Sequence, residues 1–137
     1  MNEHVAVDIA EGVSTLRIER PDKQNALTSH MYDVMSDALA FGESSSRVRC
    51  FLIMGMPGVF TAGNDITELQ TFAEQGAIGD SAIHFLKTLA LLDKPIVAAI
   101  AGHCIGDGLG LAMVCDLRLA GESARFAAPE ARLGVPA

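Results

Sequence analysis

The sequence predicts a single α/β domain with parallel strand pairing. Short, continuous apolar runs that suit buried strands, such as 48–54 and 95–101, alternate with segments whose apolar residues recur at helical spacing. Two glycine-rich turns each follow one of these runs and precede a helical segment. Half of the 137 residues are hydrophobic, which is enough for one domain of this length to bury a sizeable core.

The first half of the chain is expected to form a hairpin, a helix and a strand. Alternating apolar residues within 5–18 indicate a β-hairpin. Thr28 or Ser29 can cap the following helix, in which apolar residues recur at helical spacing through 31–39. The segment "GESSS" ends this helix, and the apolar run 48–54 then forms a buried strand.

The second half repeats the alternation of helices and strands. A short helix is expected over about 65–73, with Asp65 as its cap, and a longer helix begins at Asp80 or Ser81. The longer helix should turn one apolar face to the core, formed by Ile83, Leu86, Leu89 and Ala90. The strand 95–101, a helix over about 107–115 and a strand in "LRLAG" follow, and Asp116 is expected to accept a hydrogen bond from a backbone N–H.

Composition argues against several classes of protein. The net charge of −7 disfavours a nucleic-acid binder, which would show a basic patch. Cys50, Cys104 and Cys115 each lie in an apolar run and are expected to be reduced core thiols, not disulfide or metal ligands. We see no signal peptide and no apolar run long enough for a bilayer, and therefore expect a cytoplasmic protein. The last residues form an apolar turn, so the chain is expected to stop within a fold.

The two glycine loops, in 58–66 and 101–107, carry the strongest functional signal. The first N–H groups of a helix lack intrahelical partners and carry partial positive charge. Two helix starts that converge can direct two N–H groups at one oxygen and so form an oxyanion hole, which stabilises negative charge as it develops. Neither loop has the glycine spacing of a dinucleotide- or phosphate-binding loop. We therefore expect the two loops to form one site.

Four motifs taken together resemble the enoyl-CoA hydratase/isomerase family, the crotonase superfamily. They are "RPDKQNAL" (20–27), "GVFTAGNDITEL" (58–69), "KPIVAAIAGHCIGDGLGLAMVCDLRLA" (94–120) and "FAAPEARLGVPA" (126–137). They follow the family's order and cover nearly the whole chain, which resembles the N-terminal half of members that are typically about twice as long. The resemblance implies a ClpP/crotonase spiral of β-β-α units over 1–137, incomplete at its C-terminus because the C-terminal helical region is absent.

The resemblance also implies an acyl-CoA thioester as substrate, with coenzyme A as part of it and no separate cofactor. The backbone N–H groups of Asn64 and Asp107 would hold the thioester oxygen as it becomes an enolate. Asp107 replaces a glycine that is usual in the family, and its carboxylate is expected to face away from the substrate or to cap its own helix. The implied substrate-binding residues are Lys23, Gln24, Ala26, Ala62, Gly63, Asn64, Asp65, Ile66, Gly106 and Asp107.

The acid–base residues leave the reaction open. Glu130 in "APEARLG" matches the second of two glutamates that the family's hydratases use, whereas the first falls on Gly110. One carboxylate is enough to shuttle the proton when a double bond is isomerised, and hydration is better served by two. Enoyl-CoA isomerisation or hydration in fatty-acid metabolism, β-hydroxyacyl-CoA hydrolysis, and CoA binding by an inactive, truncated remnant therefore remain as alternatives.

The expected partner is the acyl-CoA substrate, with no metal, nucleic acid or membrane. The resemblance further implies that a full-length form assembles as a homo-oligomer, either a trimer or a hexamer.

Overall fold

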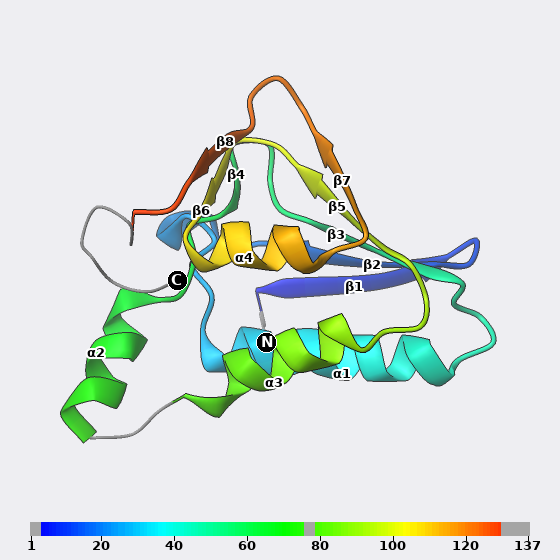
Figure 1. Cartoon of the computed structure of the whole chain (residues 1–137), viewed down its shortest axis with the longest axis horizontal. Coiled ribbons are helices and arrows are strands. Elements are labelled where there is room, and N and C mark those ends of the chain that lie inside the picture. Colours follow the sequence, from blue (N-terminus) through cyan, green and yellow to red (C-terminus); the bar gives the residue numbers. More distant parts are fainter. Residues whose placement is uncertain (1–3, 76–78, 130–137) are drawn as a thin grey trace.

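The computed structural model describes residues 4–75 and 79–129, and these form two β-sheets and several helices (Figure 1). The larger sheet has five strands in the order β1-β2-β3-β5-β7. Only the β1–β2 pair is antiparallel; the pairs β2–β3, β3–β5 and β5–β7 are parallel. The predicted α/β class with parallel pairing is therefore confirmed. The strands of this sheet are β1 (Val5–Ala10), β2 (Val13–Ile18), β3 (Cys50–Met54), β5 (Ile96–Ile100) and β7 (Leu117–Ala120).

The N-terminal hairpin forms where the alternating pattern predicts it. Glu11 and Gly12 join β1 to β2 with φ angles of 53° and 83°, the left-handed backbone of a tight hairpin turn. The carbonyl of Gly12 accepts hydrogen bonds from the N–H groups of Arg49, at 2.7 Å, and Cys50, at 3.2 Å. The turn therefore also fixes the start of β3 beside β2.

Helices α1 (Ser29–Ser44) and α3 (Asp80–Ala90) pack against each other beneath the sheet (Figure 1). Thr28 caps α1, as its sequence position predicts, because its Oγ1 accepts a hydrogen bond from the N–H of Met31 at 3.2 Å. The expected cap of α3 is wrong: Gly79 is the N-cap and no side chain caps this helix. The buried face of α3 is only partly as expected: Leu89 is buried, but its buried partner is Phe85, and Ile83, Leu86 and Ala90 are exposed.

A second, three-stranded parallel sheet was not expected from the sequence. Its strands are β4 (Val59–Thr61), β6 (His103–Ile105) and β8 (Arg125–Ala127), in the order β4-β6-β8. The first two lie within the glycine loops, which were expected to run directly from strand to helix. Each loop instead adds a short strand before its helix, α2 (Ile66–Gln75) or α4 (Asp107–Val114). The pairing of β4 with β6 brings the two loops side by side.

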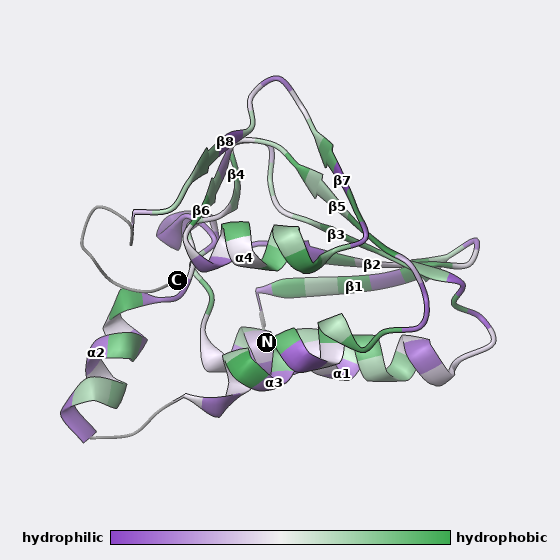
Figure 2. Cartoon of the chain, in the orientation of Figure 1, coloured by the Kyte–Doolittle hydropathy of each residue, from purple (hydrophilic) through white to green (hydrophobic). Residues whose placement is uncertain are grey.

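The core lies between the larger sheet and the inner faces of α1, α3 and α4, which carry much of the apolar sequence (Figure 2). Asp116 accepts a hydrogen bond from the N–H of Ile96 at 2.8 Å, which confirms its expected structural role. All three cysteines are free; Cys104 and Cys115 are buried as predicted, whereas Cys50 is only partly buried. Within the described residues, no helix is both long and apolar enough to cross a membrane.

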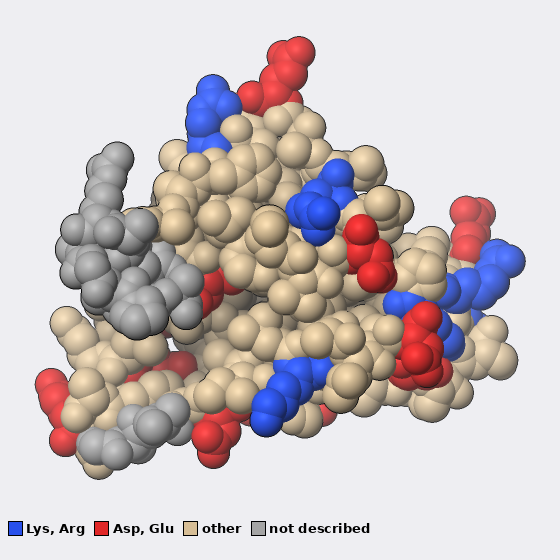
Figure 3. Space-filling model, in the orientation of Figure 1, with Lys and Arg blue, Asp and Glu red and all other residues tan. Residues whose placement is uncertain are grey.

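The opposite face of the larger sheet becomes more apolar from the hairpin towards β7. Register places Leu117 beside Val97, and Leu119 beside Ala99. Leu117 and Leu119 are 62% and 63% exposed. Helix α4 covers the other side of the sheet, where the surface is largely uncharged (Figure 3). The exposed leucines of β7 form an apolar surface of the kind that marks a contact surface in many proteins.

Candidate functional site

The segment "RPDKQNAL" folds around a buried asparagine that the sequence did not single out. Asn25 is fully buried and has a left-handed φ of 57°, a conformation that asparagine tolerates better than most residues. Its Oδ1 accepts a hydrogen bond from the N–H of Arg20 at 2.7 Å, and its Nδ2 donates to the carbonyls of Ile18 and Phe60, both at 3.1 Å. Asn25 therefore fastens this loop to β2 on one side and to β4 on the other.

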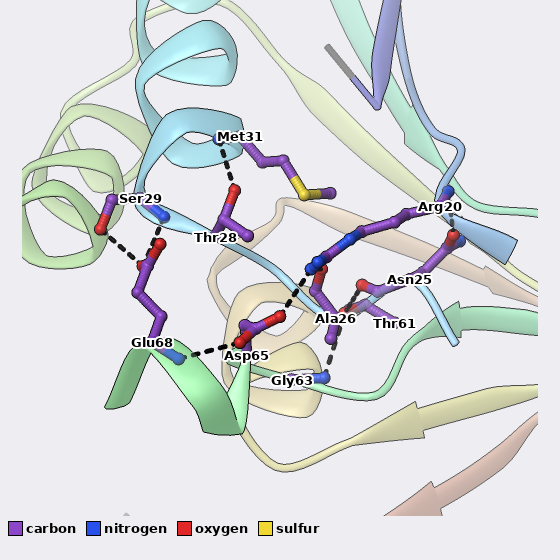
Figure 4. A network of polar contacts seen from close by, with 10 residues as sticks. All are labelled: Arg20, Asn25, Ala26, Thr28, Ser29, Met31, Thr61, Gly63, Asp65 and Glu68. Atoms are coloured by element: carbon purple, nitrogen blue, oxygen red, sulfur yellow. Dashed lines mark hydrogen bonds and ion pairs between the residues drawn. The ribbon is translucent and has the colours of Figure 1, made fainter. Parts of the chain in front are cut away.

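Asp65 joins the same loop to the start of α2 (Figure 4). Its Oδ2 lies 2.8 Å from Nη1 of Arg20, and its Oδ1 accepts a hydrogen bond from the N–H of Glu68 at 2.9 Å. The expected role of Asp65 as a helix cap is thus confirmed. The N–H of Glu68 first, and then Arg20, hold the pKa of this carboxyl below its ordinary value.

Glu68 continues this network to the start of α1 (Figure 4). Its Oε1 accepts hydrogen bonds from both the N–H and the hydroxyl of Ser29, each at 2.7 Å. The first turns of α1 and α2 are consequently tied together through one carboxylate.

The backbone of Asn64 is held by a parallel bridge to Leu27. The N–H of Leu27 donates to the carbonyl of Gly63, and the N–H of Asp65 donates to the carbonyl of Leu27, both at 2.8 Å. In a parallel bridge, the residue between these two bonds directs its own N–H to the opposite side. The N–H of Asn64 is therefore turned away from Leu27.

The second glycine loop lies directly beside the first. Gly63 has a φ of 97°, and a Cβ added to it would lie 3.1 Å from the carbonyl oxygen of Ile105 and 3.4 Å from the nitrogen of Asp107. Gly106, the N-cap of α4, also has a positive φ, of 60°. Both positions use backbone conformations that favour glycine. The main chains that carry Asn64 and Asp107 thus approach closely, as expected from the sequence.

Asn64 and Asp107 line one cavity of about 270 Å³. Most of its wall is apolar and comes from α1, α2, α3 and α4. Ile83 and Leu86, which were expected in the core, line this cavity instead. Its other apolar residues are Leu27, Leu69, Phe72, Ala82 and Leu111.

Tyr32 forms the polar end of this cavity. Its hydroxyl donates a hydrogen bond to Oδ1 of Asn64. Burial raises the pKa of Tyr32, and the carboxylates of Asp107 and Glu68 raise it further. Asp107 is thus close enough to Tyr32 for its charge to influence the phenol, although the residue itself is exposed.

A second, more open groove of about 710 Å³ adjoins the first cavity at Asn64. Asn64, Asp65 and Glu68 line both spaces. Seven of the residues singled out for substrate binding line this groove together: Lys23, Gln24, Ala26, Ala62, Asn64, Asp65 and Ile66. The site residues that sequence reasoning missed are Arg20, Asn25, Tyr32 and Glu68. Of these, Arg20, Asn25 and Glu68 lie within quoted motifs, whereas Tyr32 does not.

Of the two positions expected to carry acid–base residues in this family, only Gly110 lies within the described residues. Gly110 is exposed, and a Cβ added there would meet no atom within 4 Å. A larger side chain therefore has room at this position. Glu130 lies outside the described residues.

Comparison with known proteins agrees with this architecture. The chain is 34% identical to a mitochondrial enoyl-CoA hydratase of Pongo abelii over 122 residues, covering 89% of the chain and 42% of the relative. It is 32% identical to 4-chlorobenzoyl coenzyme A dehalogenase-2 of Arthrobacter sp over 135 residues, covering 91% of the chain and 48% of the relative. The chain spans about half the length of the curated relatives it matches.

A solved structure shows the same fold. An enoyl-CoA hydratase/carnithine racemase from Magnetospirillum magneticum superposes with a TM-score of 0.90 at 30% identity, covering the whole of this chain and 53% of that one. The α/β architecture is therefore the crotonase fold, matched to about half of a full-length structure. The family model for enoyl-CoA hydratase/isomerase matches residues 8–137. This chain belongs to the enoyl-CoA hydratase/isomerase family.

Proposed function

We propose that this chain binds an acyl-CoA thioester and stabilises its enolate, and that the reaction is isomerisation of an enoyl-CoA double bond. One observation carries the proposal: the close approach of Gly63 to the nitrogen of Asp107, beside a cavity lined by both Asn64 and Asp107. The N–H groups of Asn64 and Asp107 would donate to the thioester oxygen. Donors fixed in this way stabilise charge that develops during the reaction.

The two adjoining spaces suit the two parts of such a substrate. The cavity of about 270 Å³ has mostly apolar walls and would take the acyl chain. The open groove, with Lys23 and Gln24 on its edge, would take the CoA moiety. Asn64 lies where the spaces meet, so the thioester between acyl chain and CoA would come to rest there.

The proton is moved by Glu130 in this proposal. Its carboxylate would remove a proton from the carbon between the thioester and a β,γ double bond, and the electron pair would move onto the thioester oxygen as the enolate forms. The same proton would then return at the γ-carbon as the double bond moves into conjugation. One carboxylate is sufficient for this shuttle, and Gly110 offers no second one.

Absorbance of the conjugated thioester tests the proposal. The purified 137-residue chain should convert 3-hexenoyl-CoA to its conjugated isomer and should act more weakly on crotonyl-CoA, because hydration calls for a second acid–base group. Butyryl-CoA, which has no double bond to move, is the control. Faster loss of crotonyl-CoA than gain of conjugated hexenoyl-CoA would favour hydration, and absence of acyl-CoA binding would refute the proposal.

A further inference from the structure

Tyr32 is held rigidly at the wall of the proposed acyl cavity. Its side chain belongs to the first turn of α1, which Thr28 caps and Glu68 anchors through Ser29. Tyr32 is only 5% exposed, and its ring packs against Phe85 with centroids 5.5 Å apart and planes tilted by 44°. The position of its hydroxyl is therefore set by the packing of α1 on α3.

The hydroxyl of Tyr32 contacts Asn64, whose backbone N–H is the proposed donor to the thioester oxygen. It donates to Oδ1 of Asn64, while the parallel bridge to Leu27 holds the main chain on either side of Asn64. Asn64 is thus restrained through both its main chain and its side chain. A phenol with the ordinary pKa of 10.0 is already protonated at neutral pH, and burial, Asp107 and Glu68 raise the pKa of Tyr32 further, so its hydroxyl is a donor there.

We propose that Tyr32 is a positioning residue, whose hydrogen bond to the Asn64 side chain fixes the direction of the Asn64 backbone N–H. The inference rests on the proposed function, in which that N–H binds the thioester oxygen. Small displacements of a donor weaken transition-state stabilisation more than they weaken substrate binding. Removal of this one hydrogen bond should therefore lower kcat and leave KM nearly unchanged.

The variant Tyr32→Phe removes the hydroxyl and retains the ring beside Phe85. We expect kcat for 3-hexenoyl-CoA to fall roughly three- to tenfold, the range for one hydrogen bond between neutral groups, with KM changed less than about twofold. The same substitution in an Asn64→Ala background should cause no further loss, because the acceptor is already gone.

Two control variants separate positioning from packing. Thr88→Val removes a hydroxyl that donates to the carbonyl of His84, away from the cavity, and should leave kcat unchanged. Phe85→Leu loosens the ring contact but retains the hydroxyl, so it should lower kcat less than Tyr32→Phe does, even though it lowers the melting temperature more. A loss of kcat in Phe85→Leu as large as the loss in Tyr32→Phe would overturn the inference.

A readout that needs no turnover distinguishes this inference from the proposed function. In Tyr32→Phe, the NMR signal of the Asn64 backbone amide should shift and its hydrogen exchange should accelerate, whereas Thr88→Val should leave both unchanged. An unaltered Asn64 amide would overturn the positioning role, whether or not the chain is active. If the wild-type chain neither binds nor converts acyl-CoA, the proposed function fails, and the Asn64 amide alone decides whether Tyr32 positions this loop.

Discussion

A Cβ added to Gly63 would lie 3.4 Å from the backbone nitrogen of Asp107, so the two glycine loops are in direct contact through their main chains. Residue 63 thus borders the space between the two proposed donors without filling it.

Replacement of Gly63 by valine should harm turnover more than folding. The side chain would crowd the nitrogen of Asp107 and the carbonyl of Ile105, and the φ of 97° is unfavourable for any residue with a Cβ. We expect at least about a tenfold loss of kcat if one donor is displaced. Gly58→Ala is the matched control in the same loop, since a Cβ there meets no atom within 4 Å. Parallel losses of activity and melting temperature in Gly63→Val would indicate a purely structural glycine.

Glu130→Gln should remove proton transfer while CoA affinity is retained. The expected loss of isomerase activity is about 10²- to 10⁴-fold, the usual contribution of a general base. Glu122→Gln, at an exposed carboxylate, is the control and should keep full activity. Isothermal titration with an acyl-CoA, together with the absorbance assay, separates binding from chemistry. Full activity in Glu130→Gln would show that another group is the base.

The Asp65 carboxyl should make the fold sensitive to acid. Its pKa in the folded chain is lowered from 3.8 by the Glu68 N–H and then by Arg20. A lowered folded-state pKa contributes stability that is fully present above the unfolded value and is lost as pH falls below it. Urea unfolding from about pH 6 down to about pH 3 should therefore show a steeper loss of stability in the wild type than in Asp65→Asn. Asp37→Asn, exposed on α1, should retain the wild-type slope.

Tyr32 should make the fold sensitive to alkali. Burial raises the pKa of its phenol above the ordinary 10.0, so the stability it contributes is intact below that value and decreases as pH rises past it. Tyr32→Phe should remove this loss. The chain has one tyrosine and no tryptophan, so phenolate absorbance reports Tyr32 alone. Ionisation of the folded chain with an ordinary tyrosine midpoint would contradict the buried setting of the hydroxyl.

The apolar edge at β7 should promote association. Leu117 and Leu119 are exposed on one face of a strand at the border of the larger sheet. Such a surface favours contact with another molecule. The double variant Leu117→Lys and Leu119→Lys should lower the weight-average mass in sedimentation and reduce binding of a dye specific for apolar surface. Val7→Lys, on the distant strand β1, is the control. A wild-type chain that sediments as a monomer without binding the dye would contradict this prediction.

Local sequence patterns were sufficient for the main elements of the fold. The hairpin, the capped helix α1 and the strands β3 and β5 follow from periodicity and turn chemistry that act over a few residues. The two glycine loops were expected to lie together and they do, and most of the residues expected to bind the substrate or CoA line one groove. That the loops form one active site stays a prediction. The apolar face of α3 was misjudged, because periodicity does not distinguish a side chain packed in the core from one that lines a cavity.

What the sequence by itself determined was the order of the hairpin, the helices and the strands of the larger sheet, together with the expectation that the two glycine loops lie together. Only the tertiary structure decided how these loops meet. Strands β4, β6 and β8 have three residues each, too few for a periodic signal, and they exist because each completes the hydrogen bonds of another. Asn25 and Tyr32 likewise look ordinary in the sequence. Their roles depend on polar partners in β4 and at Asn64, which folding alone brings within hydrogen-bonding distance.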